Sequence, residues 1–168
     1  MIEVDHVRRW ALALPETAEK PHVHLVGFRV ADVGFAGVDE RRGVALLNVD
    51  PSLERSEAGI GPLTRGSTPI GVEVDCAVAD PALVERLVAE AWRFRAPAVV
   101  ADAHPYVGAP SGGALPKAIG IAATRALRHA GLATWDAVRA ADLDALLDLH
   151  GVGPRAVRIL RERLGETD

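Results

Sequence analysis

Two segments of the chain, one near the N-terminus and one after residue 80, have hydrophobic residues at helical spacing. Residues 4–14 carry an apolar side chain every three or four positions, which predicts a helix that Pro15 ends. Asp80 followed by Pro81 is typical of a helix N-terminus, and the apolar positions after them predict a helix to about Arg95.

From Phe28 the hydrophobic spacing becomes two, which is the period of a β-strand, and Phe28 and Val30 alternate around Arg29. Residues 33–38 and 44–49 are predicted strands, and the polar turn 39–43 between them predicts a β-hairpin. Residues 59–71 are rich in Gly, Pro, Ser and Thr and predict a loop, whereas residues 72–76 alternate again and predict a strand. The order helix, strands, helix predicts an α+β fold, an antiparallel sheet with helices on one face.

Residues 115–168 have only helical patterns. The predicted helices begin at Ile121, at the capping residues Thr134 and Asp142, and at Pro154. We therefore expect a small all-α domain there.

Composition divides the chain into two predicted domains. Residues 98–114 combine alanines, prolines and glycines without apolar periodicity, and we expect them to be a linker. The sequence thus predicts an α+β domain at residues 1–97, a linker at 98–114 and a helical domain at 115–168.

The turn before the last predicted helix, residues 151–154, has the sequence Gly-Val-Gly-Pro. Both glycines can adopt positive φ and let a partner approach the backbone, and proline suits the first helical position. Backbone N–H groups at the positive end of a helix dipole bind phosphate, and two arginines follow one turn apart. The candidate nucleic-acid contacts are Gly151, Val152, Gly153, Arg155 and Arg158. A simple helix connection and a protein-docking element are the alternative interpretations of this turn.

This hairpin and the helices around it resemble a helix-hairpin-helix domain, most closely the C-terminal domain of the bacterial RNA polymerase alpha subunit. The resemblance covers about residues 115–164 and rests on Leu115-Pro116, Ile119-Gly120, Ala126-Leu127, Ala130-Gly131-Leu132 and His150-Gly151-Val152-Gly153. It implies that backbone donors and basic side chains hold a DNA phosphate without reading bases, or that the domain docks another protein. The earlier turn at Gly120 lacks a second glycine, so we expect little binding there.

Residues 1–97 resemble the MmcQ/YjbR family. The motifs are Leu14-Pro15-Glu16, Glu19-Lys20-Pro21-His22, Phe28-Arg29-Val30 and Ala91-Trp92-Arg93-Phe94-Arg95-Ala96-Pro97. Members are described as small DNA-binding proteins with an α+β fold similar to frataxin-like domains and with wing-like loops, so the resemblance implies the fold first and DNA binding second. Arg41 and Arg42, at the tip of the predicted hairpin, are the candidate wing contacts, and a solvated turn is the alternative.

Charge is distributed unevenly along the chain. Residues 1–112 carry 11 Lys and Arg against 16 Asp and Glu, a balance of −5, and residues 113–168 carry 8 against 7, a balance of +1. A phosphate contact is therefore expected in the C-terminal part. The composition, 49% hydrophobic and 25% charged, is typical of a soluble globular protein.

Other chemistry has little support in the sequence. The single cysteine, Cys76, excludes an internal disulfide and lies in a strand pattern that predicts a core residue. His22 and His24 alternate as a metal pair would but lack a third ligand, so we predict no metal site. Because no nucleophile–histidine–acid pattern and no nucleotide loop stands out, we expect no enzyme activity and no cofactor.

The N-terminal residues lack the basic and apolar regions of a signal peptide, and no apolar run approaches the roughly 18 residues of a membrane span. We therefore expect a cytoplasmic protein. The leading hypothesis is a non-enzymatic protein that binds duplex DNA through sequence-independent phosphate contacts of the helix-hairpin-helix module. The alternative is a protein–protein interaction adaptor without nucleic acid, which the net charge of −4 fits better.

Overall fold

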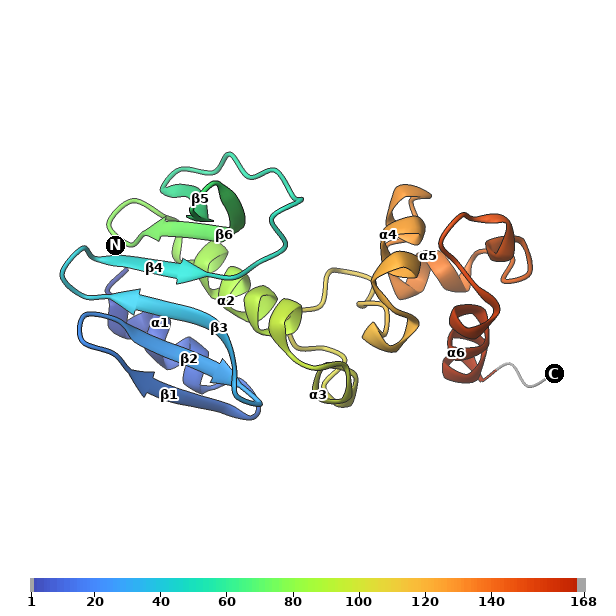
Figure 1. Ribbon diagram of the computed structural model, residues 1–168, viewed down its shortest axis with the longest axis horizontal. Coiled ribbons are helices and arrows are strands. Elements are labelled where there is room, and N and C mark those ends of the chain that lie inside the picture. Colours follow the sequence, from blue (N-terminus) through green and yellow to red (C-terminus); the bar gives the residue numbers. More distant parts are fainter. Residues whose placement is uncertain (1, 166–168) are drawn as a thin grey trace. The chain divides into compact units, whose positions relative to one another are not determined.

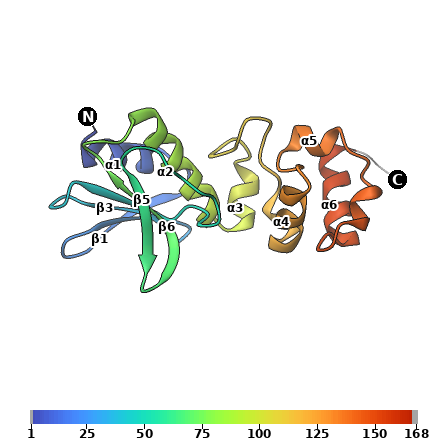
Figure 2. The ribbon, with the colours of Figure 1, turned by 90° about the horizontal axis from the view of Figure 1, so that it is seen from above.

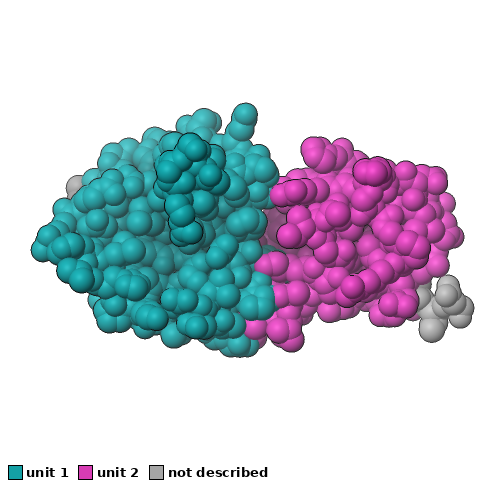
Figure 3. Space-filling view, in the orientation of Figure 1, with its two compact units in different colours: residues 1–97 teal, residues 98–168 magenta. Residues whose placement is uncertain are grey.

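A computed structural model describes residues 2–165, which contain six strands, six α-helices and two 3-10 helices. The predicted α+β class is confirmed. The chain divides into two compact units, residues 1–97 and residues 98–168 (Figure 3).

The first unit contains one antiparallel sheet of six strands in the order β1-β2-β3-β4-β6-β5 (Figure 1). The connection from β4 to β5 passes β6, which lies between them in the sheet, whereas the other neighbours in sequence are also neighbours in the sheet. The strands are β1 (Thr17–Pro21), β2 (Val26–Val30), β3 (Val33–Asp39), β4 (Val44–Leu47), β5 (Ile60–Arg65) and β6 (Thr68–Asp75).

The helices α1 (Val4–Leu12) and α2 (Pro81–Arg95) lie on one face of this sheet, as predicted (Figure 2). Helix α2 begins at the predicted cap, because the Asp80 carboxylate accepts the Leu83 N–H at 2.8 Å. The core between the sheet and the helices contains fully buried side chains from both layers, among them Val7, Phe28, Leu47, Val74, Leu87 and Trp92.

Two of the strands, β1 and β5, were not among the predicted elements. Strand β5 lies in residues 59–71, where a loop was expected, and forms a hairpin with β6 around Gly66, whose φ is +62°. The prediction of a loop was therefore wrong. Glycine, proline and threonine are tolerated here because β5 is an edge strand. A proline removes the hydrogen-bond donor on only one side of a strand, and an edge strand has a partner on only one side.

Both edge strands carry a proline on their open side. N–H groups of an antiparallel strand point alternately toward and away from the partner. The His22 N–H donates to the Leu25 carbonyl, which places Pro21 among the β1 positions that face away from β2. By the same alternation, the bond from Asp75 N–H to the Gly59 carbonyl places Pro62 among the β5 positions that face away from β6.

Several motif residues of the first unit hold its elements together. The buried Trp92 indole N–H donates to the Pro15 carbonyl at 2.9 Å and so fixes the chain that follows α1. Arg29 and Arg95 donate to backbone carbonyls of the β2–β3 hairpin at 3.0 and 3.1 Å. These residues have contacts within the fold that account for their presence.

The regular elements of the second unit, as far as residue 165, are all helices, as the pattern of residues 115–168 predicts. It contains α3 (Ala98–Ala103), η1 (Lys117–Ile119), α4 (Ile121–His129), α5 (Trp135–Arg139), η2 (Ala145–Asp148) and α6 (Pro154–Leu164), where η denotes a 3-10 helix. Its buried core includes Leu115, Ile119, Leu127, Val138, Leu146, Val152, Val157 and Leu160. The Thr134 hydroxyl accepts the Ala137 N–H and begins α5, as expected.

Residues 98–114 differ from the expected linker because they are folded into the second unit. Within them, the Asp102 side chain is 8% exposed and accepts the N–H groups of Lys117 and Ala118 at 3.0 and 3.3 Å. The carbonyls of residues 112–113 accept the first N–H groups of α5, both at 3.0 Å. The segment is thus ordered by polar contacts with later residues and by the burial of Val100 and Ala101 in α3.

Candidate functional site

The first part of the glycine turn before α6 is required by the fold. Gly151 has a φ of +99°, as predicted, and a Cβ atom at this position would lie 3.2 Å from the Ala122 carbonyl oxygen. Val152 is 6% exposed and belongs to the core, and its N–H donates to the Leu149 carbonyl at 2.9 Å. Neither the Val152 side chain nor its N–H is therefore available to a ligand.

Gly153 has a different environment. Its φ of −100° and ψ of 170° are extended, so the expected positive φ is wrong for this residue. No atom lies within 4 Å of the position that a Cβ would occupy. Within residues 2–165 the N–H groups of Gly153 and Arg155 have no hydrogen-bond partner. The backbone at Gly153 is therefore open to a partner. Neither its conformation nor its packing requires glycine.

The N-terminus of α6 has no compensating negative charge. Its N-cap is Gly153, no side chain caps it, and its first turn has no acidic residue. By contrast, α2 and α5 begin with the side-chain caps Asp80 and Thr134. The positive end of the α6 dipole is therefore available to an external anion.

Two arginines lie beside this helix terminus. Arg155 is exposed and has no ion-pair partner among the described residues. Arg158 forms an ion pair with Glu162 at 3.7 Å, but both side chains are about 70% exposed, at 70% and 68%. Such a pair contributes little to stability, so Arg158 can exchange Glu162 for a phosphate at small cost.

Residues 117–129 and 150–162 are an internal repeat with an offset of 33 positions, as Gly120 and Gly153 show. In each copy a turn leads into an α-helix, and the buried residues Ile119, Ala123 and Leu127 of the first copy correspond to the buried Val152, Ala156 and Leu160 of the second. Identical pairs are Gly120 and Gly153, Ala123 and Ala156, Arg125 and Arg158, Leu127 and Leu160, and Arg128 and Arg161. The repeat escapes notice in the sequence because the first copy has alanine where the second has Gly151.

The turns of the two copies lie together, because Gly151 packs against the Ala122 carbonyl near the start of α4. Helix α4 also lacks a capping side chain and an acidic first turn. Its N-cap, Gly120, has a φ of +89° and a ψ of 161°, a conformation that essentially only glycine adopts. The second copy has Arg155 where the first has Ala122, so the two turns differ in charge.

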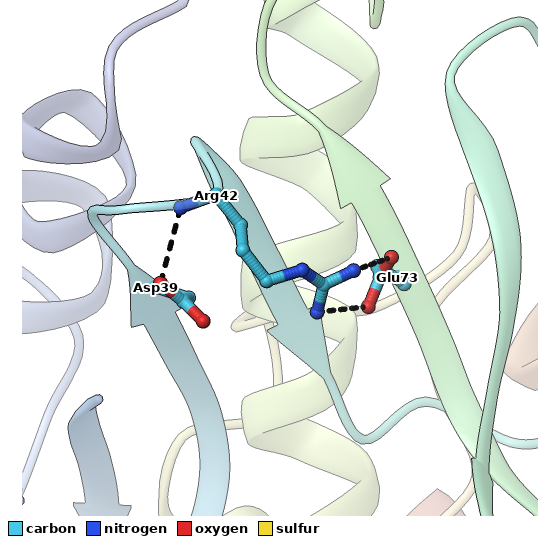
Figure 4. Close-up of polar contacts among 3 residues, drawn as sticks. All are labelled: Asp39, Arg42 and Glu73. Carbon is cyan, nitrogen blue, oxygen red and sulfur yellow. Dashed lines mark hydrogen bonds and ion pairs between the residues drawn. The ribbon is translucent and has the colours of Figure 1, made fainter. Parts of the chain in front are cut away.

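The hairpin tip of the first unit uses one of its two candidate arginines internally (Figure 4). The Asp39 carboxylate accepts the N–H groups of Arg41 and Arg42, each at 3.1 Å. The Arg42 guanidinium binds both carboxylate oxygens of Glu73 at 2.6 and 3.0 Å, and this hydrogen bonding and charge raise the pKa of Arg42. Arg42 is thus committed to Glu73, whereas Arg41 is exposed and has no ion pair in the described part of the chain.

Other reactive groups do not come together. Among residues 2–165, no three His, Cys, Asp or Glu side chains are placed to hold a metal ion. Cys76 is buried, as expected, and burial, followed by the nearby Asp75 charge, raises the pKa of its thiol. The described helices include none with the length and apolar character needed to cross a bilayer.

Comparison of the chain with protein families, curated proteins and solved structures gives no significant match. The candidate site therefore rests on the geometry of the two turns and on the internal repeat.

Proposed function

We propose that the second unit is a pair of helix-hairpin-helix motifs that binds duplex DNA through backbone phosphates, without base readout and without catalysis. The main support for this proposal is the environment of Gly153. Its backbone does not need glycine, its surroundings do not exclude a side chain, and its N–H and that of Arg155 are free among the described residues. Close approach of a phosphate to the backbone accounts for glycine at this position.

The arginines support the same ligand. Arg155 and Arg158 lie on the first turns of α6, and Arg125 is the counterpart of Arg158 in the first copy of the repeat. Guanidinium groups bind phosphate oxygens with charge-assisted hydrogen bonds. Three exposed arginines around two uncapped helix termini suit a backbone with regularly spaced phosphates.

The binding is expected to be weak, and its salt dependence is expected to reflect a small number of phosphate contacts. Residues 98–168 carry 8 Lys and Arg against 8 Asp and Glu, so the unit has no formal net charge to attract DNA from a distance. Each phosphate contact contributes a slope of about −0.9 to the plot of log affinity against log salt. A protein that contacts few phosphates therefore has a shallow slope of log affinity against log salt.

For the first unit we propose the MmcQ/YjbR-like fold and a secondary role in binding. It carries 11 Lys and Arg against 15 Asp and Glu, a balance of −4, which disfavours a broad polyanion surface. Arg41 is the wing-like contact that its hairpin tip offers, since Arg42 is held by Glu73.

The test is a salt titration of the full chain with a fluorescent DNA duplex, followed by anisotropy. The double variant Arg155→Glu/Arg158→Glu is expected to lose binding, because both phosphate contacts become repulsive. Arg139→Glu is the matched control, since Arg139 is an exposed arginine of the same unit that pairs with Asp136. Equal affinity of the double variant and the wild type would overturn the proposal.

The adaptor without nucleic acid is the second candidate. Val99 and Tyr106, in and just after α3, are 79% and 90% exposed, and apolar side chains of this kind favour a protein partner. An adaptor would show no duplex binding even at low salt. Its partner would be lost with Tyr106→Ser and retained by the Arg155→Glu/Arg158→Glu variant.

A further inference from the structure

Ile121, the first residue of α4, has a large apolar side chain that lies outside the hydrophobic core. It is 73% exposed and follows the glycine N-cap directly. Its counterpart in the second copy of the repeat is Pro154, which suits the first helical position for conformational reasons. A β-branched residue has no such advantage at the start of a helix.

An exposed arginine and the second turn of the repeat lie near the start of α4. Arg125 lies one turn further along α4 on the same face, is exposed, and has no ion pair among residues 2–165. The carbonyl of the next residue, Ala122, packs against Gly151 of the second turn. Ile121 is therefore an exposed apolar side chain at the start of the helix that carries Arg125, and the residue after it packs against the second turn.

We propose that Ile121 lies against a deoxyribose of duplex DNA, between two phosphates of the backbone. This inference rests on the proposed function of the second unit. The positive charge of Arg125 complements a phosphate, and the carbon atoms of the sugars are the apolar surface that separates successive phosphates. A protein partner would need a wider apolar surface than this one side chain offers.

The same contact selects DNA over RNA. The minor groove of an RNA duplex displays 2′-hydroxyl groups, and a hydroxyl buried against isoleucine loses its hydrogen bond to water. Deoxyribose has no such hydroxyl. The first turn thus contributes an apolar contact that favours DNA, while the second turn contributes the charge of Arg155.

The test compares the wild type with Ile121→Ser on DNA and RNA duplexes of the same sequence, across a range of salt. The variant is expected to bind DNA about five- to tenfold more weakly at every salt concentration, because apolar contact is lost. The salt slope is expected to stay the same, since no counterion release changes. RNA binding is expected to be unaffected, so that discrimination between the duplexes falls.

Val78→Ser, which removes a 58% exposed valine from the first unit, controls for the general loss of exposed apolar surface. Ile121→Ala is a second variant that keeps the helix start and is expected to lose less DNA affinity. Unchanged DNA affinity in both Ile121 variants, or an equal loss on RNA, would overturn the inference while the proposed function stands. A wild type that binds neither duplex overturns the proposed function and, with it, this inference.

Discussion

Gly151 lies against the carbonyl oxygen of Ala122, and this contact joins the two copies of the internal repeat in the second unit. A Cβ atom at Gly151 would be 3.2 Å from that oxygen and 3.5 Å from the Ala126 methyl group. The contact requires a residue without a side chain, in a backbone conformation with a φ of +99°. The arrangement of the two turns therefore depends on this glycine.

Gly151→Ala is expected to destabilise the second unit by about 1–3 kcal/mol, since positive φ and a tight carbonyl contact both oppose a methyl group. Thermal or urea unfolding followed by circular dichroism measures the change. Gly66→Ala, in the turn between β5 and β6, has a similar positive φ of +62° but open surroundings. It should therefore cost less, and equal losses would show that the carbonyl contact contributes nothing.

Gly153→Asp is expected to stabilise the protein and abolish DNA binding. Aspartate at the N-cap accepts the free N–H group of Arg155 and complements the helix dipole, which contributes about 0.5–1 kcal/mol. The same carboxylate occupies the proposed phosphate position with like charge. Unfolding curves and anisotropy on the same preparation measure both effects. Retained DNA affinity would contradict the assignment of this helix terminus as the phosphate site.

Asp102→Ala is expected to destabilise the second unit by about 1–3 kcal/mol, because it leaves the N–H groups of Lys117 and Ala118 without their acceptor. It also removes the carboxylate that lies 3.8 Å from the Arg163 guanidinium. Chemical denaturation checks the value. Asp136→Ala is the control, since Asp136 is 69% exposed and its ion pair with Arg139 is expected to contribute little. Similar values for the two variants would contradict the structural role of Asp102.

Glu90 gives the first unit a specific pH dependence. Burial raises the pKa of Glu90, and the repulsion from Asp50 and Glu57 adds to this effect, while the ion pair with Arg55 opposes it. Because the folded pKa lies above the ordinary value, the fold favours the protonated carboxyl. The contribution of Glu90 to stability is therefore complete below its unfolded pKa and is lost as pH rises through the folded pKa.

Glu90→Gln is expected to remove that fall in stability between acidic and neutral pH. Urea unfolding at a series of pH values measures it, and Glu85→Gln, an exposed carboxylate on the same helix, is the matched control. An unchanged pH profile in Glu90→Gln would show that the raised pKa has no energetic consequence. The Nε of Arg55 is buried without a hydrogen-bond partner, so the pair is incompletely satisfied even at neutral pH.

Local signals in the sequence predicted much of this fold. Helix α2 begins where Asp80 and the following proline predict it, because a cap and its helix are adjacent in the chain. Strands β1 and β5 escaped prediction because edge strands tolerate charged residues, proline and glycine in place of regular alternation. The role of Asp102 was not predictable either, since it caps residues that follow it by fifteen and sixteen positions.

The candidate site was predictable only in part. Gly151 and Gly153 belong to one motif and have the same side chain, yet the first is needed for packing and the second is not. Only the backbone angles and the neighbouring atoms separate these roles. Likewise, the sequence does not distinguish Arg41 from Arg42. The two arginines differ because Arg42 pairs with Glu73, which lies on a strand thirty-one positions further along the chain.

The prolines at the two borders of the sheet limit how this protein can assemble. A strand from another molecule that aligned with β1 or β5 would find no N–H group at Pro21 or Pro62, where a ladder needs one. Association of native molecules by sheet extension is therefore disfavoured at both ends. Side-chain surfaces are therefore favoured over the two sheet borders as places where copies of this protein associate.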